Sequence, residues 1–106
     1  MRSVTISQTG VGASSPAVLD RNIVPFNVGI SCLVTGTATY TIQHTFADPF
    51  ASGGLSGATW FDHDVSNLVG ATTNINGNFA YPCTASRINI TSGSGTVSAT
   101  YVQGVV

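Results

Sequence analysis

Charged side chains are scarce in this sequence of 106 residues. Aspartate, glutamate, lysine and arginine together make up 7% of it, far below the roughly 25% that is usual in globular proteins. There is no lysine, and the only positively charged residues are Arg2, Arg21 and Arg87. So few cations cannot neutralise a run of phosphates, which argues against nucleic acid and anionic membrane surfaces as partners.

Long apolar runs and cysteine motifs are also missing. No stretch approaches the roughly 20 apolar residues that a membrane-spanning helix needs. The N-terminal residues alternate polar and apolar side chains, which predicts a strand and not a signal peptide. The two cysteines, Cys32 and Cys83, have neither a CxxC spacing nor a histidine pattern beside them. We therefore expect free, buried thiols; a disulfide between the two is the alternative, and a metal site has less support than either.

Threonine, serine, asparagine and glycine take the place of the missing charge. Short runs that alternate apolar and polar residues are separated by clusters of glycine, serine, asparagine and proline. This pattern predicts an all-β protein with antiparallel strands, a β-sandwich or a barrel. The length predicts a single domain over residues 1–106. A surface with so little charge has weak protection against association, which favours a subunit whose faces meet partners.

The N-terminal third contains two expected strands. The first covers residues 3–8, with Val4 and Ile6 facing inward, and the second covers residues 17–19. Between them, residues 9–16 have the composition of a loop.

Residues 26–46 have the strongest strand pattern. Alternate positions carry apolar side chains over residues 28–34 and again over residues 38–46, always at even numbers. If these two runs form a hairpin with their apolar sides on one face, paired residue numbers must have an even sum. A three-residue loop over residues 35–37 satisfies this condition, because it pairs Val34 with Ala38 and Cys32 with Tyr40.

Two further hairpins are expected nearer the C-terminus. An even-numbered loop within residues 92–95 pairs Ile90 with Val97 and Ile88 with Ala99. The dipeptide at Asn76 and Gly77 lies between two possible strands and is a strong hairpin-turn signal.

Catalytic chemistry finds little support. The only cluster of titratable residues is Asp62, His63 and Asp64, which is an incomplete ligand set for a metal and fits a turn or helix-capping role better. Alternation places His44 on an inward face, where a core or interface histidine is the simplest interpretation. No serine lies in a nucleophile elbow, and neither cysteine has an activating base. We predict no catalytic residues, no cofactor and no small-molecule substrate.

Residues 47–70 form the longest irregular stretch, with one short helical candidate at residues 63–69. The stretch carries four large apolar side chains, Phe50, Leu55, Trp60 and Phe61. Two interpretations remain open. The stretch can fold back and cap one end of the sandwich, or these side chains can anchor a partner, as aromatic residues often do at interfaces.

Several segments together resemble small β-rich virion proteins of tailed bacteriophages. They are DRNIVPFNVGI at residues 20–30, GTATYTIQHTF at residues 36–46 and GNFAYP at residues 77–82, followed by the strand around Arg87 and the SGSG repeat. The likeness spans residues 4–102. It includes no catalytic signature.

The resemblance implies a capsid decoration, or cement, protein. Such a protein is a jelly-roll-like sandwich, often a homotrimer, that is made in the host bacterial cytoplasm and sits on the virion surface. It binds the major capsid protein and braces neighbouring capsomers. A trimer that engages several sites gains avidity even when each contact is weak.

Two other functions stay open at this stage. One is a tail, neck or fibre component, which would be present in few copies. The other is a carbohydrate-binding module, with Trp60, Tyr40 or Tyr81 as platforms on which sugar rings stack.

Overall fold

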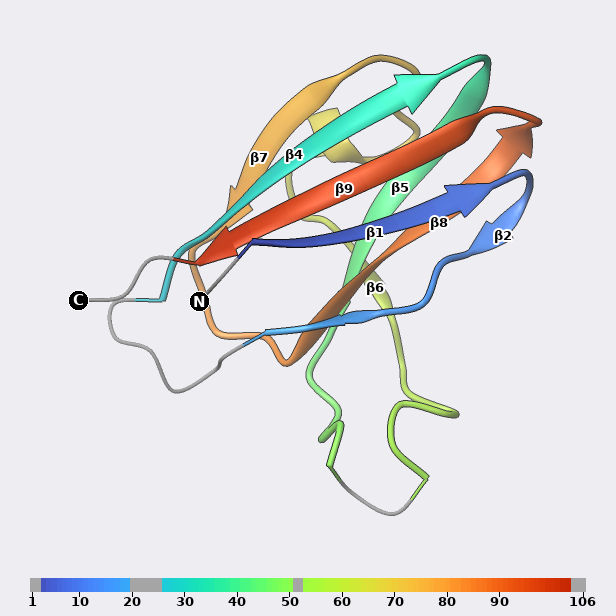
Figure 1. The fold of residues 1–106 in the computed structure, drawn as a ribbon. Helices are drawn as coiled ribbons and strands as arrows, with labels where there is room; N and C mark the ends of the chain where they lie inside the picture. The colour runs from blue at the N-terminus through green and yellow to red at the C-terminus, as the bar shows by residue number, and fades with distance from the viewer. Residues whose placement is uncertain (1–2, 20–25, 51–52, 104–106) are drawn as a thin grey trace.

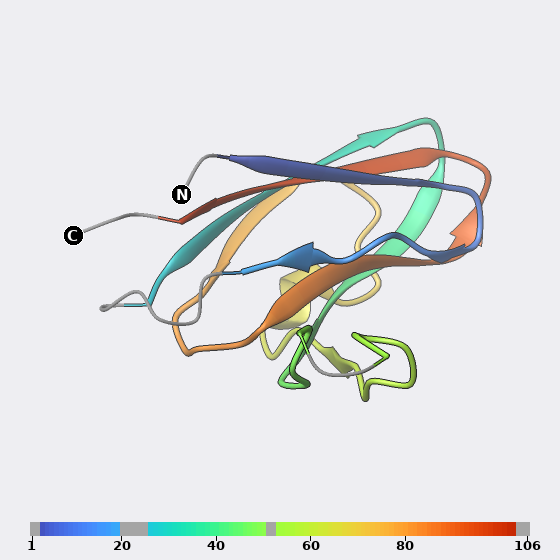
Figure 2. The ribbon, with the colours of Figure 1, turned by 60° about the horizontal axis from the view of Figure 1, so that its bottom comes forward.

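Two antiparallel sheets face each other in the computed structural model, which describes residues 3–19, 26–50 and 53–103 (Figures 1 and 2). We call them sheet A and sheet B. Sheet A contains, in spatial order, β1 (Val4–Thr9), β9 (Thr96–Gln103), β4 (Val28–Thr35) and β7 (Ile75–Phe79). Sheet B contains β2 (Gly12–Ala13), β8 (Ala85–Gly93), β5 (Ala38–Thr45) and β6 (Phe61–Asp62), and β3 (Ala17–Val18) also pairs with β8. The expected all-β, antiparallel sandwich is confirmed.

Consecutive strands mostly lie in opposite sheets. If β2 and β3 are taken as one interrupted strand, only the connection from β5 to β6 stays within a sheet. This alternation, with orders β1-β9-β4-β7 and β2-β8-β5-β6, is the arrangement of a jelly roll. The jelly-roll-like architecture is therefore confirmed.

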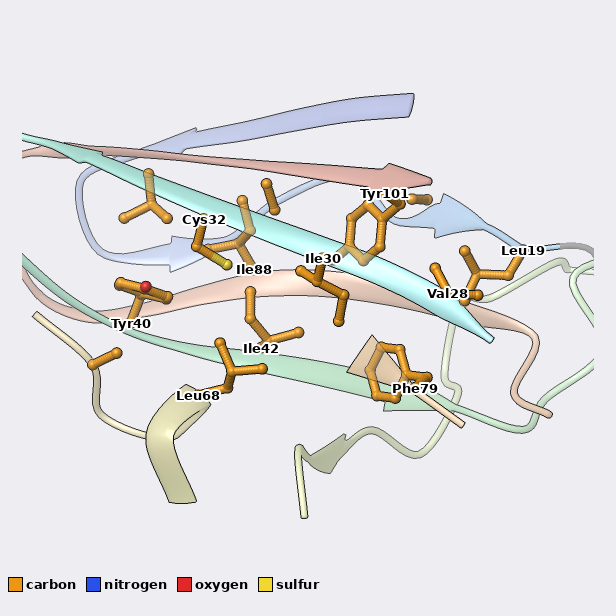
Figure 3. Close-up of a cluster of buried hydrophobic side chains, with 14 of the residues drawn as sticks. Leu19, Val28, Ile30, Cys32, Tyr40, Ile42, Leu68, Phe79, Ile88 and Tyr101 are labelled. Carbon is orange, nitrogen blue, oxygen red and sulfur yellow. The ribbon is translucent and has the colours of Figure 1, made fainter. Parts of the chain in front are cut away.

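The core fills the space between the two sheets. Alternate side chains of each long strand point into it, including Val28, Ile30 and Cys32 of β4 and Tyr40 and Ile42 of β5. Figure 3 shows side chains from both sheets meeting there. The alternation in the sequence thus identified the buried faces correctly, as expected for strands that have a core on one side.

The three expected hairpins are wrong. Val34 pairs with Val97 and Ala38 pairs with Gly93, so β4 and β5 belong to different sheets. Strands β8 and β9 also lie in different sheets. The even-sum argument failed because two apolar faces can also meet across the core, where no backbone pairing is required.

Gly77 serves a different purpose from the expected turn. It lies inside β7, opposite Ile30 of β4. The single 3₁₀ turn η1 (Ser66–Leu68) falls within the helical candidate at residues 63–69 and places Leu68 against Gly77. A Cβ atom at position 77 would lie 2.5 Å from Cδ1 of Leu68. The glycine therefore allows Leu68 to enter the core at the edge between β5 and β7 (Figure 3).

The remaining strand expectations need small corrections. The first strand runs one residue later than expected, and residues 9–16 include β2. Val4 and Ile6 lie opposite Tyr101 and Ala99, on the inner face of sheet A. Val4 nevertheless stays 37% exposed, because β1 is an edge strand and the core thins out there.

Part of the polar face of β5 is buried. The hydroxyl of Thr45 donates a hydrogen bond to the Thr59 carbonyl at 2.8 Å, and the Gly70 N–H donates to the Thr41 hydroxyl at 3.0 Å. The segment over residues 59–71 thus covers the free edge of β5 and part of its outer face. These residues of the irregular stretch thus fold back over an edge of sheet B, and a cap at one end of the sandwich stays a prediction.

Both cysteines are free and buried, as expected. Burial raises the pKa of the Cys32 thiol to about 11, although a hydrogen bond with Tyr40 opposes the shift. Burial also raises the pKa of the Cys83 thiol to about 12. Both side chains are therefore neutral thiols at physiological pH, and they act as small apolar groups in the core.

No helix among the described residues is long and apolar enough to cross a membrane.

Candidate functional site

Aromatic rings gather at the end of β5 where the chain leaves the sandwich. His44 lies at the centre, with ring centroids 5.5 Å from Phe46, 5.9 Å from Phe61, 5.2 Å from Phe79 and 5.6 Å from Tyr81. These five residues form what we call the aromatic cluster. His44, Phe61 and Phe79 lie in β5, β6 and β7, so three strands of the sandwich fix their positions, whereas Phe46 follows β5 and Tyr81 follows β7. Edge-to-face contacts at these distances stabilise such clusters beyond simple burial of area.

His44 is the buried base of the cluster. It is 4% exposed, and its Nε2 lies 3.3 Å from the Tyr81 hydroxyl. Its Nδ1 has no hydrogen-bond partner among the described residues. Burial is the main reason that the pKa of His44 lies below its ordinary value of 6.5, with a further contribution from His63. The nearby carboxylates of Asp64 and Asp62 act in the opposite direction.

His63 is buried beside the cluster and holds β7 in place. Its ring lies 4.7 Å from that of Phe79. Its Nδ1 accepts a hydrogen bond from the Val65 N–H at 3.0 Å, and its Nε2–H donates to the Asn78 carbonyl at 2.8 Å. In the neutral form of the ring, these two bonds place the proton on Nε2. They also give His63 a structural role, joining the segment after β6 to β7.

The outer rim of the cluster is exposed. Phe46 is 55% exposed and Phe61 is 47% exposed, with their centroids 6.0 Å apart. Tyr81 stacks on Phe46 at 6.2 Å and is partly exposed. We call these three residues the aromatic patch. Adjacent exposed rings held by a buried base are a rigid apolar surface, which is the kind of surface that protein interfaces use as anchors.

Sequence reasoning placed Phe61 at a possible interface but missed Phe46. Alternation along β5 predicts an inward position for residue 46, and the strand ends at Thr45, before this residue. Phe46 therefore projects past the rim of the sandwich. The available signal was the sequence that follows, Ala47, Asp48 and Pro49, because this composition ends a strand.

Trp60 lies on the outer face of sheet B, next to the patch in sequence but in a different environment. The Arg87 guanidinium stacks over its ring at 4.4 Å. The Nε–H of Arg87 donates to Oε1 of Gln43 at 2.9 Å, and Nε2 of Gln43 donates to Asp62 at 3.0 Å. This row connects an arginine to a carboxylate through a glutamine across β8, β5 and β6, and it covers one side of Trp60.

The other predicted interface residues lie in the segment between β5 and β6, which extends below the sandwich in Figure 1. Phe50 is 77% exposed, and Leu55 is partly buried. Their role at an interface stays a prediction. Tyr40, by contrast, is fully buried and donates a hydrogen bond to the Thr73 carbonyl at 2.8 Å, so it cannot stack on a sugar ring.

The three residues Asp62, His63 and Asp64 do not converge. His63 is buried, whereas Asp62 is exposed and bonded to Gln43. Asp64 is exposed, with one carboxylate oxygen 3.4 Å from Nδ1 of His63. Within the described residues, no three His, Cys, Asp or Glu side chains gather where they could hold a metal ion.

Protonation of His44 is expected to destabilise the protein in mild acid. Because the pKa of His44 is lower in the folded protein, the unfolded chain binds this proton first as the pH falls. Stability from this residue is therefore complete above pH 6.5 and decreases below that pH. We expect the melting temperature to fall as the pH is lowered from about 7.5 to about 5.

Two variants isolate the imidazole. His44→Phe removes the titrating ring and its unpaired nitrogen while keeping an aromatic side chain. It should gain about 1 kcal/mol at neutral pH and show a flatter pH profile. Tyr81→Phe removes the hydrogen bond between the Tyr81 hydroxyl and Nε2 of His44, as His44→Phe also does, but it leaves the imidazole in place. It should therefore keep the wild-type pH dependence. An unchanged slope in His44→Phe would assign the acid sensitivity to other groups.

Comparison of the sequence with protein-family models and with curated proteins finds no match.

Proposed function

We propose that this protein is a non-enzymatic capsid decoration protein, of the kind found on tailed bacteriophages, that docks on the outer shell through the aromatic patch. Its partner is the major capsid protein, and its role is to brace neighbouring shell subunits. The proposal combines the resemblance of residues 4–102 to small virion proteins with the position of the exposed rings.

The aromatic patch is the observation that carries the proposal. Phe46 and Phe61 together expose a large apolar surface at one end of the sandwich, and the buried His44 and Phe79 fix their orientation. Rigid aromatic side chains lose little conformational entropy on binding, and so they often contribute most of the binding energy at an interface.

The low charge of the chain is consistent with this role. A net charge of −1 over 106 residues gives little long-range repulsion when many copies crowd onto one particle. It also gives little electrostatic steering, so affinity has to come from burial of apolar surface and from several contacts made at once.

Binding to shells assembled without the protein tests the proposal. The wild-type protein should bind saturably, with hundreds of copies per particle by quantitative mass spectrometry normalised to the major capsid protein. Phe46→Ser and Phe61→Ser should each weaken binding at least about tenfold, as expected when an aromatic anchor is removed. Leu33→Ser is the matched control, because Leu33 is also 55% exposed but lies on the outer face of sheet A.

Each other result would redirect the assignment. A handful of copies would place the protein in the tail or neck, and no saturable binding would remove the shell function. Shell binding that is equally strong in Phe46→Ser, Phe61→Ser and the control would show that the aromatic patch is not the docking surface.

A further inference from the structure

Strand β1 has a free edge among the described residues, and this edge differs from the other sheet edges. At the opposite edge of sheet A, the Asn78 carbonyl of β7 already accepts a hydrogen bond from His63. In sheet B, β6 has two residues, and the opposite edge is divided into β2 and β3, also of two residues each, with Pro16 between them. Short, interrupted or occupied edges prevent strands of other chains from pairing. Strand β1 has six residues and no proline.

The pairing with β9 determines which backbone groups of β1 point outward. The Gly10 N–H donates to the Gly95 carbonyl at 3.1 Å, toward β9. In an antiparallel pair this direction alternates, so Gln8, Ile6 and Val4 bond to β9, and Ser7 and Thr5 direct their N–H and C=O groups away from it. The side-chain geometry agrees. Hydroxyls of Thr5 and Thr100 lie 3.0 Å apart, as in the close, non-bonded type of pair.

From Ser3 to Leu19 the sequence has no charged residue, and the whole chain has no lysine. Lysine on an edge strand is one of the common devices that keep proteins monomeric, since like charges repel when two identical edges meet. Two copies of this chain could bring their β1 strands together without such repulsion over these residues.

We infer that β1 is the site at which a second copy of this chain adds to sheet A, in an antiparallel arrangement about a two-fold axis through Thr5. Thr5 then pairs with Thr5 of the other copy, and Ser3 pairs with Ser7 in both directions. Each pair exchanges two N–H to C=O bonds. A two-fold axis is the natural symmetry for an edge that pairs with itself.

The inner face favours this register. It places Val4 of one copy opposite Ile6 of the other, in the close type of pair. Val4 is 37% exposed and Ile6 is partly exposed in the single chain. The pairing therefore covers apolar side chains that the edge leaves open, and it joins two copies of sheet A into one continuous sheet. This inference is independent of the aromatic patch, and it predicts a dimer where the resemblance implies a trimer.

A proline at position 5 tests the inference. The Thr5 N–H makes no bond within sheet A, so Thr5→Pro should keep the fold, as proline does on the outer side of edge strands. It should abolish the dimer, because proline has no N–H and the two hydrogen bonds between Thr5 and Thr5 of the other copy are lost. Thr5→Ala is the control, since it removes the hydroxyl bond to Thr100 but keeps the N–H.

The measurement is molar mass by sedimentation equilibrium on a dilution series, with circular dichroism to check folding. Wild type and Thr5→Ala should give twice the 10.8 kDa chain mass at high concentration, and Thr5→Pro should give the single-chain mass. A single-chain or three-chain mass for wild type would overturn the inference. A dimer that persists in Thr5→Pro would do the same.

Two lysine variants, Thr5→Lys and Thr100→Lys, test the dimer if Thr5→Pro fails to fold. Thr5→Lys places like charges opposite each other on the axis and should abolish the dimer. Thr100→Lys adds the same charge to the same face of sheet A, one strand further in, and should retain it. Equal masses for these two variants would overturn the inference.

Discussion

Gly95→Ala is expected to lose about 3 kcal/mol or more of folding free energy, enough to leave a small domain largely unfolded. A Cβ atom at position 95 would lie 2.7 Å from the Thr35 carbonyl oxygen, 2.8 Å from the Thr37 nitrogen and 2.8 Å from the Thr37 carbonyl oxygen. All three atoms belong to the backbone, so no side chain can rotate away to make room.

The close approach at Gly95 has a clear origin. The connection from β8 to β9 and the connection from β4 to β5 both cross between the sheets at the same end of the sandwich (Figure 1). The Gly95 N–H donates to the Thr37 carbonyl at 2.8 Å, which joins the two connections directly. Alanine at position 95 would separate them.

Gly29→Ala provides the control for this experiment. Gly29 lies within β4, and a Cβ atom there would meet only the Val102 carbonyl oxygen, at an ordinary 3.7 Å. Urea denaturation should place this variant within about 0.5 kcal/mol of wild type. A Gly95→Ala protein as stable as Gly29→Ala would contradict the packing of the two connections.

The second large effect is expected for Leu68→Ala, with a loss of about 2–4 kcal/mol. Leu68 is 1% exposed and is the one buried residue of η1. Its side chain fills the space between β5 and β7, where the two sheets would otherwise leave the core open. Truncation leaves a cavity, and the strands on both sides of it cannot move in to fill the space. The cavity therefore adds to the free energy lost with the apolar contact.

Val69→Ala separates this packing effect from any effect on the 3₁₀ turn. Val69 follows Leu68 directly and is 39% exposed, so its truncation should cost no more than about 1 kcal/mol. Thermal unfolding of both variants gives the comparison. Similar losses in the two proteins would mean that the turn, and not the buried leucine, stabilises this edge.

The sequence supported some predictions of the fold better than others. Alternation identified the buried sides of β4 and β5, because burial on one face imposes a period of two on each strand. It could not say which strands are neighbours. An inward-facing Val34 is compatible both with pairing to Ala38 in one sheet and with packing against the other sheet across the core. The dipeptide at Asn76 and Gly77 predicts a turn, but the glycine is needed because Leu68 packs against it. That contact joins residues nine positions apart, and no local pattern shows it.

The site was predictable only in part for a related reason. Phe61 was recognised as a large apolar residue in an irregular segment. The contact of Trp60 with Arg87 and the position of His44 under Phe46 and Tyr81 depend on how segments distant in the chain come together. No local pattern contains that information.

The central position of β9 affects when the protein can fold during synthesis. Among the described strands β9 leaves the ribosome last, and it lies between β1, the first, and β4. Sheet A therefore cannot assemble until translation has passed Gln103, and β1 waits without its pairing partner until then. During this interval VTISQT is an uncharged, proline-free strand without its pairing partner, and this is the composition that favours pairing with other chains.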